Sequence, residues 1–231
     1  MPLKFFGRGS GFSNEHTSAY FITPENEMVI IDCPVSTFQK VKNMDLTQFN
    51  EIYVLITHTH GDHVGGLGLL CQYGFFVLNK KISIICPSFD VAKDVSVLMQ
   101  IEGNNIDWYF ISTCSAIYKK SWFKTCIQVP HAQNLKGKCF GYNLLVDDKN
   151  VIYSGDTSSL KPFVKYLTGG SILYTDASVY YGQIHLKLED SLDFLDKLVQ
   201  KNIRVYLMHL DDVEAAEKLI ENHPGISVVE I

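Results

Sequence analysis

Three features that would narrow the function at once are missing from this sequence. It has no run of about 18 apolar residues, so a membrane-spanning helix is not expected. Its six cysteines form no CxxC pair, which disfavours a structural zinc site of the cysteine type. Its formal net charge of −5 lacks the basic excess of a broad nucleic-acid surface, although it leaves room for a small anionic substrate.

The N-terminus also lacks the apolar core and the small-residue cleavage site of a secretory signal, since it begins MPLKFF. The cysteines are dispersed through expected strands and helices, and a chain of this size does not need disulfides for stability. We therefore expect reduced thiols, a cytoplasmic location and no membrane partner.

Length and composition favour one folded unit. A chain of 231 residues with 46% hydrophobic content can bury a substantial core. Apolar segments extend from residue 3 to residue 230 without a long polar break, and no repeat or low-complexity segment interrupts them. We expect a single domain over residues 1–231.

What the sequence does contain is a dense cluster of metal-capable side chains. His58, His60, Asp62 and His63 follow the apolar run 52–56, which is typical of a buried strand. A glycine-rich segment that can open a helix comes next, so the cluster falls on a strand-to-helix loop, where active sites of α/β folds collect. Imidazole and carboxylate together suit Zn, Mn or Fe.

The pattern of a strand followed by a possible ligand recurs three more times. His131 follows an apolar strand and a proline, Asp156 follows Ser154-Gly155 at a strand end, and His209 directly follows another strand. Strand ends meet at one edge of a sheet, so these side chains can converge although they are remote in sequence.

Periodicity predicts a mixture of α and β structure. The segment 7–11 is rich in glycine but lacks the Gly-Lys-Ser/Thr ending of a phosphate loop, so we expect a tight turn beside the active site. Expected strands are 3–6, 18–23, 28–32, 52–56, 81–86, 109–111, 125–129, 139–146, 150–154, 171–176, 205–209 and 226–230. Expected helices are 35–41, 66–78, 89–100, 160–167, 187–201 and 213–222.

The arrangement His58-x-His60-x-Asp62-His63 resembles the HxHxDH signature of the metallo-β-lactamase-fold superfamily, and the later strand ends extend the match along the chain. The resemblance implies a four-layer αββα sandwich that binds two divalent metal ions, zinc first and Mn or Fe as alternatives. It also implies that Asp32, after its own strand, supports the metal loop. By the same resemblance the first metal takes His58, His60 and His131, the second takes Asp62, His63 and His209, and Asp156 bridges both.

Such a centre implies hydrolysis by a metal-bridging hydroxide, which Asp62 orients. The segment around His185 resembles the one that carries a general acid or phosphate contact in the tRNase Z-like and cyclic-nucleotide phosphodiesterase branch, with Asp176 as its partner. Ile184 and Lys187 depart from that pattern, because Gly and Ser or Thr are common at those positions.

The resemblance therefore implies a phosphodiesterase for a small phosphodiester or a cyclic nucleotide, and a homodimer. Three alternatives stay open: a hydrolase of thioesters, lactones or lactams, an RNA 3′-processing endonuclease, and a non-catalytic metal-binding domain. The endonuclease is disfavoured because nothing resembles the Gly-, Pro- and basic-rich arm that grips tRNA. Aromatic side chains that could stack on a base, although such residues are more often core, are Trp108, Tyr109, Phe110, Tyr180 and Tyr181.

Overall fold

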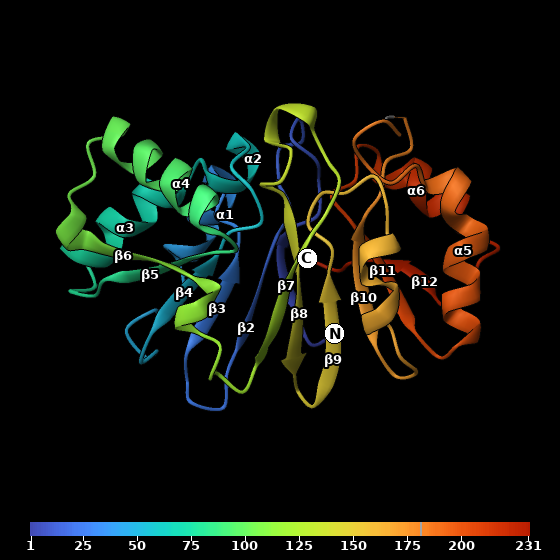
Figure 1. The fold of residues 1–231 in the computed structure, drawn as a ribbon, viewed down its shortest axis with the longest axis horizontal. Helices are drawn as coiled ribbons and strands as arrows, with labels where there is room; N and C mark the ends of the chain where they lie inside the picture. The colour runs from blue at the N-terminus through green and yellow to red at the C-terminus, as the bar shows by residue number, and fades with distance from the viewer. Residues whose placement is uncertain (181) are drawn as a thin grey trace.

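Two six-stranded sheets lie face to face in this protein, and helices cover both outer faces (Figure 1). This arrangement, seen in a computed structural model that describes residues 1–180 and 182–231, confirms the predicted αββα sandwich. None of the helices in those residues is long and apolar enough to cross a membrane.

The first sheet holds its strands in chain order. The first three strands are antiparallel neighbours, and the remaining ones add in parallel. Parallel pairing fits their near-continuous apolar sequences, because both faces of these strands are covered. The strands are β1 (Lys4–Gly7), β2 (Ser18–Ile22), β3 (Met28–Ile31), β4 (Ile52–Leu55), β5 (Ile82–Cys86) and β6 (Tyr109–Thr113).

The second sheet repeats this plan in reverse spatial order, with β7 and β12 at its edges. Its first three strands are antiparallel neighbours and the last three are parallel additions. The strands are β7 (Phe123–Gln128), β8 (Phe140–Val146), β9 (Lys149–Tyr153), β10 (Ile172–Asp176), β11 (Arg204–Met208) and β12 (Ile226–Val228).

Three apolar layers hold the sandwich together. The central layer joins the inner faces of both sheets, and includes Leu55 of β4, Tyr142 of β8 and Met208 of β11. The outer layers lie between each sheet and its own helices. On the first sheet these are α1 (Val35–Val41), α3 (Leu67–Phe76) and α4 (Phe89–Ile101); on the second they are α5 (Leu188–Gln200) and α6 (Val213–Leu219).

The short helices differ from expectation in two places. A single turn, α2 (Gly61–Val64), lies inside the expected metal loop. The α-helix expected over 160–167 is instead a 3₁₀-helix, η4 (Lys161–Tyr166), with Pro162 in its first turn. Proline supplies no backbone N–H, and a segment this short gains little from α-helical hydrogen bonds. The other 3₁₀ turns are η1 (Ile106–Trp108), η2 (Cys114–Ala116) and η3 (Gln133–Leu135).

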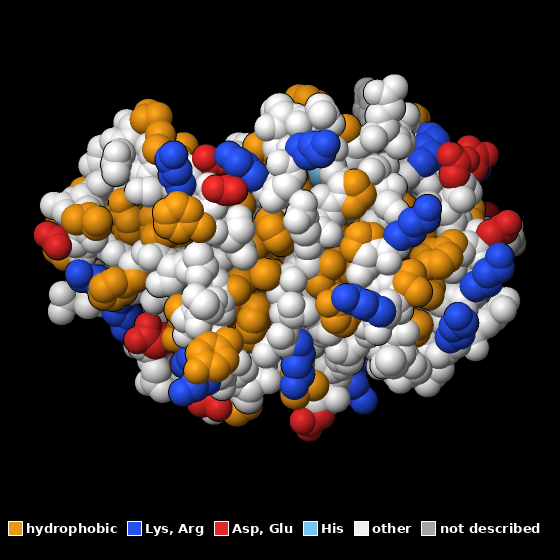
Figure 2. Space-filling model, in the orientation of Figure 1, with side chains coloured by type: hydrophobic (Ala, Val, Ile, Leu, Met, Phe, Trp, Pro, Cys, Tyr) orange, Lys and Arg blue, Asp and Glu red, His pale blue; other side chains and the backbone are white. Residues whose placement is uncertain are grey.

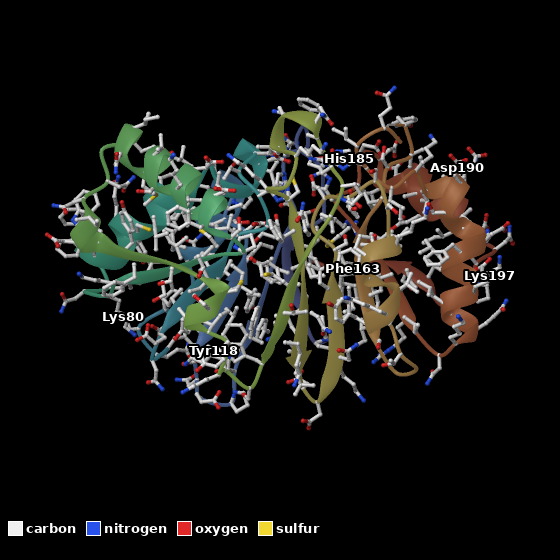
Figure 3. The ribbon with its side chains drawn as sticks, in the orientation of Figure 1. Lys80, Tyr118, Phe163, His185, Asp190 and Lys197 are labelled. Atoms are coloured by element: carbon white, nitrogen blue, oxygen red, sulfur yellow. The ribbon has the colours of Figure 1, made fainter. Side chains whose placement is uncertain are left out.

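The carboxyl ends of six strands open onto one edge of the sandwich. β3, β4, β7, β9, β10 and β11 each end there, immediately before a polar loop. Figure 3 shows His185 at this edge, on the segment that leads into α5. The fold thus delivers loops from both halves of the chain to one place.

Candidate metal centre and active site

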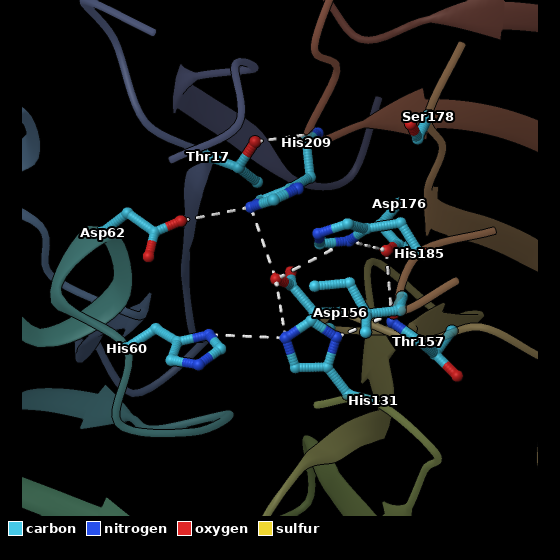
Figure 4. Close-up of polar contacts among 12 residues, drawn as sticks. Thr17, His60, Asp62, His131, Asp156, Thr157, Asp176, Ser178, His185 and His209 are labelled. Atoms are coloured by element: carbon cyan, nitrogen blue, oxygen red, sulfur yellow. Dashed lines mark hydrogen bonds and ion pairs between the residues drawn. The ribbon is translucent and has the colours of Figure 1, made fainter. Parts of the chain in front are cut away.

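One carboxylate oxygen lies at the middle of the site. Oδ2 of Asp156 is 3.4 Å from Nε2 of His63 and 3.4 Å from Nε2 of His209. It is 3.6 Å from Nε2 of His131 (Figure 4). It is 3.7 Å from Nε2 of His58. These distances exceed those of ordinary hydrogen bonds, so four imidazole nitrogens face one oxygen without bonding to it directly. Such a donor set fits cations held between the nitrogens and the carboxylate.

The nominated ligands fall into two neighbouring groups, and a third group of possible donors, Asp156, Asp176, His185 and His209, overlaps both. His60 Nδ1 lies 3.0 Å from His58 Nε2 and 3.3 Å from His131 Nε2, and Asp156 completes this group. Asp62, His63 and His209 form the other group, in which Asp62 Oδ2 lies 3.3 Å from His209 Nε2 and 3.5 Å from His63 Nε2. The structure brings together all seven residues that the sequence nominated as ligands.

Tight backbone turns deliver these side chains. Gly155 has a φ of +59°, and a Cβ there would lie 2.5 Å from the carbonyl oxygen of Phe140, so only glycine fits before Asp156. His209 also has a positive φ, 54°. Thr17 Oγ1 accepts a hydrogen bond from the N–H of His209 at 2.8 Å, which holds that turn against the first sheet.

Asp32 supports the metal loop from below, as predicted. Its Oδ1 accepts the N–H of Thr57 at 2.8 Å, and its Oδ2 accepts the Thr57 hydroxyl at 2.7 Å. The same Oδ2 lies 2.8 Å from Nδ1 of His63, which places the proton of that ring on Nδ1. The opposite nitrogen, His63 Nε2, is buried and has no hydrogen-bond partner within the described residues, as a metal ligand requires.

A backbone carbonyl orients the ring of His131, as Asp32 orients the ring of His63. Nδ1 of His131 donates to the carbonyl oxygen of Ile184 at 2.8 Å and leaves Nε2 directed at the centre. Because the main chain makes this contact, the side chain at position 184 is free to differ from glycine. The departure noted in the sequence therefore leaves the site intact.

The electrostatics of the group of His58, His60 and His131 favour metal binding, whereas the charges of Asp156 and Asp32 outweigh burial and raise the pKa of His63. Burial lowers the pKa of His58 well below its usual range and also lowers the pKa of His60 and of His131. Neutral imidazole is the form that binds metals. Burial alone would raise the pKa of Asp156, but the charges of His209 and His63 hold it well below the usual range.

His185 lies outside the two groups of nominated ligands but within the third group of possible donors, with Asp156, Asp176 and His209. Its Nδ1 is 2.8 Å from Oδ2 of Asp176 and 3.9 Å from Oδ2 of Asp156, and its ring stacks on His209 with centroids 4.9 Å apart. Burial lowers its pKa, but the hydrogen bond and the charge of Asp176 outweigh burial, and the net pKa of His185 is raised. The side chain is 17% exposed, so it reaches solvent.

The glycine-rich turn borders the site, as expected. The N–H of Ser10 donates to the carbonyl oxygen of Leu210 at 2.9 Å. A Cβ on Gly11 would lie 3.0 Å from Oδ2 of Asp62. The turn thus limits the space around one candidate ligand.

The aromatic residues that could have stacked on a base contact other parts of the protein. Trp108 packs against Phe75 and Phe76, with ring centroids 6.0 and 5.1 Å away. Tyr109 is buried, Phe110 is exposed on an edge strand, and the Tyr180 hydroxyl donates to Asp212 at 2.7 Å. Tyr181 lies outside the described residues. None of the four described rings is shown at the centre.

Solved structures share this fold over almost the whole chain. YhfI, a metallo-β-lactamase fold protein from Bacillus subtilis, has a TM-score of 0.74 at 13% identity and covers 99% of this chain and 96% of its own. A diphosphatase of the PhnP family has a TM-score of 0.73 at 16% identity, with 99% and 94% covered. Zn²⁺-bound PqqB from Methylobacterium extorquens has a TM-score of 0.72 at 13% identity, with 99% and 97% covered. Fold and donor set define a protein of the metallo-β-lactamase fold whose clustered histidines and aspartates could hold metal ions.

Within that class, the chain belongs to the Anti-Pycsar protein Apyc1 family, whose sequence model matches residues 1–229. The Apyc1 protein of Bacillus phage BSP38 is 24% identical over 230 residues, which cover 91% of this chain and 89% of the phage protein. Ribonuclease Z of Lactiplantibacillus plantarum is 27% identical over 155 residues, which cover 62% of this chain and 48% of that enzyme. The chain is a metal-dependent phosphodiesterase.

Proposed function

We propose that this protein hydrolyses a cyclic nucleotide, or a phosphodiester of similar size, with two divalent metal ions, zinc before Mn or Fe. The observation that carries the proposal is the His185–Asp176 pair beside the histidine and aspartate cluster. Phosphodiester cleavage expels an alkoxide, and a protonated imidazole is the group that such a leaving oxygen needs.

The ligand assignment follows the two groups of donors. His58, His60 and His131 would hold one cation, Asp62, His63 and His209 the other, and Asp156 would contribute to both. Imidazole and carboxylate donors without cysteine accept Zn, Mn and Fe alike, and the zinc in PqqB supports zinc. When bound, the cations would acidify the attacking water and neutralise charge on the phosphoryl oxygens.

Two side chains would then handle protons. Burial alone would raise the pKa of Asp62, but the hydrogen bond from His209 and the charges of His63 and His209 keep it below its usual range, so Asp62 stays ionised and can orient the attacking water. Asp176 holds Nδ1 of His185, which leaves Nε2 free to protonate the leaving oxygen. Because its pKa is raised, more of the His185 ring carries that proton near neutral pH.

A small substrate suits the rest of the chain better than tRNA. The match to ribonuclease Z covers 48% of that enzyme, and the net charge here is −5. Figure 2 shows Lys and Arg spread over one face among acidic and apolar side chains, with no continuous basic stripe on that face.

The same proposal includes a single domain, a homodimer and a cytoplasmic location. The six cysteines are free thiols, which suits a reducing compartment. The neighbouring exposed rings of Phe75 and Phe76 are compatible with association of two copies. Sedimentation of the metal-loaded protein at micromolar concentration tests the dimer.

The assay compares metal-loaded wild type and His185→Ala on 3′,5′-cyclic nucleotides, bis(p-nitrophenyl) phosphate and a thioester. We expect cyclic nucleotide cleavage by the variant to fall by about 10²- to 10⁴-fold. The p-nitrophenolate group leaves without help, so its release should fall much less. His223→Ala is the matched control, because His223 pairs with Asp196 at the same 2.8 Å but lies in the loop between α6 and β12. Thioester cleavage that survives in His185→Ala, without phosphodiester cleavage by wild type, would support the rival hydrolase.

A further inference from the structure

Asp211 connects the loops that carry two of the residues described above. It follows His209 by two positions, and its carboxylate accepts hydrogen bonds from the segment that leaves β10 and leads to His185. We propose that Asp211 is a positioning residue that fixes His185 relative to the metal cluster. This inference rests on the proposed function of His185.

The carboxylate of Asp211 accepts three hydrogen bonds from consecutive residues. Its Oδ2 accepts the Ser178 hydroxyl at 2.5 Å and the N–H of Tyr180 at 3.1 Å, and its Oδ1 accepts the N–H of Val179 at 2.8 Å. Two of the donors belong to the main chain, so the carboxylate fixes the path of the backbone itself. Hydrogen bonds to an ionised acceptor are among the stronger ones in proteins.

Residues 178–180, which Asp211 binds, contact the chain directly after His185 and lie close in sequence to Asp176. Ser178 stands two residues after Asp176, the partner of His185. The N–H of Ser178 donates to the carbonyl of Leu186 at 2.8 Å, and the N–H of Leu188 donates to the carbonyl of Ser178 at 2.9 Å. The ammonium of Lys187 also donates to the carbonyl of Val179. A displacement of residues 178–180 would therefore move both His185 and its carboxylate partner.

Asp211 itself stands on a fixed backbone. The N–H of Leu210 donates to the carbonyl of Arg8 at 2.9 Å, and the carbonyl of Leu210 accepts from the N–H of Ser10 at 2.9 Å. The neighbouring residue, Asp212, caps helix α6, because its Oδ1 accepts the N–H of Ala215 at 2.9 Å. The carboxylate of Asp211 is therefore left to join the two loops.

The consequence is selective for the leaving group. If Asp211 positions His185, its loss should slow cleavage only where the leaving oxygen needs a proton. A shift of about 1 Å in a catalytic group can cost roughly 10²-fold in rate. We expect Asp211→Ala to lower kcat for a 3′,5′-cyclic nucleotide by about 10- to 100-fold, with a small change in KM and in bis(p-nitrophenyl) phosphate cleavage.

The test uses three variants of the zinc-loaded full chain. Asp211→Ala removes both acceptor oxygens and with them all three hydrogen bonds, whereas Asp211→Asn keeps one oxygen for Val179 and should retain an intermediate kcat. Asp196→Asn, on the outer face of α5, controls for the loss of a carboxylate that pairs with a histidine. Zinc content and amide hydrogen exchange of residues 178–180 are measured on each protein.

Faster exchange at Val179 and Tyr180, wild-type zinc content and a loss confined to the cyclic nucleotide would support the inference. An equal loss on both substrates together with loss of zinc would overturn it, because Asp211 would then act through His209. Wild-type kcat in Asp211→Ala would overturn it as well. If wild type and His185→Ala cleave both phosphodiesters equally, the proposed function of His185 fails instead, whatever the exchange of the loop shows.

Discussion

Replacement of Asp32 by asparagine isolates the contribution of one buried carboxylate to the metal loop. Asp32 is fully buried, has a φ of +60° and accepts hydrogen bonds from the Thr57 N–H, the Thr57 hydroxyl and His63 Nδ1. Asparagine has the same shape and tolerates a positive φ. Its amide, however, offers one oxygen, and its NH₂ group would face donors.

The size of the effect follows from these contacts. A hydrogen bond to a charged group contributes about 1.5–3 kcal/mol, and a buried donor left without an acceptor costs a further 1–3 kcal/mol or so. We take a loss of about 3 kcal/mol for Asp32→Asn. For a chain of this size, each kcal/mol shifts Tm by roughly 2–4 °C, so Tm should fall by about 6–12 °C. Loss of the bond to His63 should weaken metal affinity by about 10- to 100-fold.

The measurement is thermal unfolding with and without zinc, together with a competitive zinc titration. Asp148→Asn is the control, because Asp148 has a φ of 57° like Asp32 but is exposed in a hairpin turn. A variant at position 32 with the Tm and zinc affinity of wild type would refute the role assigned to this carboxylate. A fall in Tm with unchanged zinc affinity would refute only its action through His63.

Two further perturbations probe the centre directly. Removal of the metal with a chelator should lower Tm, because the folded chain alone assembles the site, and zinc at about 100 times its dissociation constant should restore about 2.7 kcal/mol. Gly11→Ala should lower zinc affinity and activity with little change in folding, since the new Cβ would lie 3.0 Å from Oδ2 of Asp62. Gly61→Ala is its control, because a Cβ there meets nothing within 4 Å. Equal zinc affinity in the two alanine variants would show that the glycine-rich turn does not constrain Asp62.

The candidate ligands could be predicted from the sequence because they lie at the ends of expected strands. Each follows an apolar strand, and strand ends in such a sandwich meet at one edge. The same logic located Asp32 and Asp176, which also end strands and contact His63 and His185. The positions of the strand ends in the sequence were therefore sufficient to predict that these residues, distant along the chain, lie close together.

The contacts that hold the candidate ligands in place could not be predicted from the pattern of strands. Ile184 acts through its carbonyl oxygen, which every residue possesses, so no side-chain pattern could reveal it. Thr17 supports His209 across 192 positions of sequence, from the other sheet. The sequence predicts an α-helix where η4 forms a 3₁₀-helix, because the spacing of apolar residues over so short a segment does not distinguish the two kinds of helix. An acidic residue two positions after a ligand histidine, as at Asp211, is the one signal that could have been noticed.

The turns at the strand ends explain why such support is needed. Asp32 and His209 both adopt a left-handed backbone directly after a parallel strand, and Gly155 does so before Asp156. For residues other than glycine this conformation costs on the order of 1 kcal/mol or more, and surrounding contacts must impose it. The turn at His209 is held by Thr17 and by the bonds of Leu210, and that at Asp32 by Thr57. A site built on such turns keeps its geometry only while these contacts persist, so its function should be more sensitive to them than its fold.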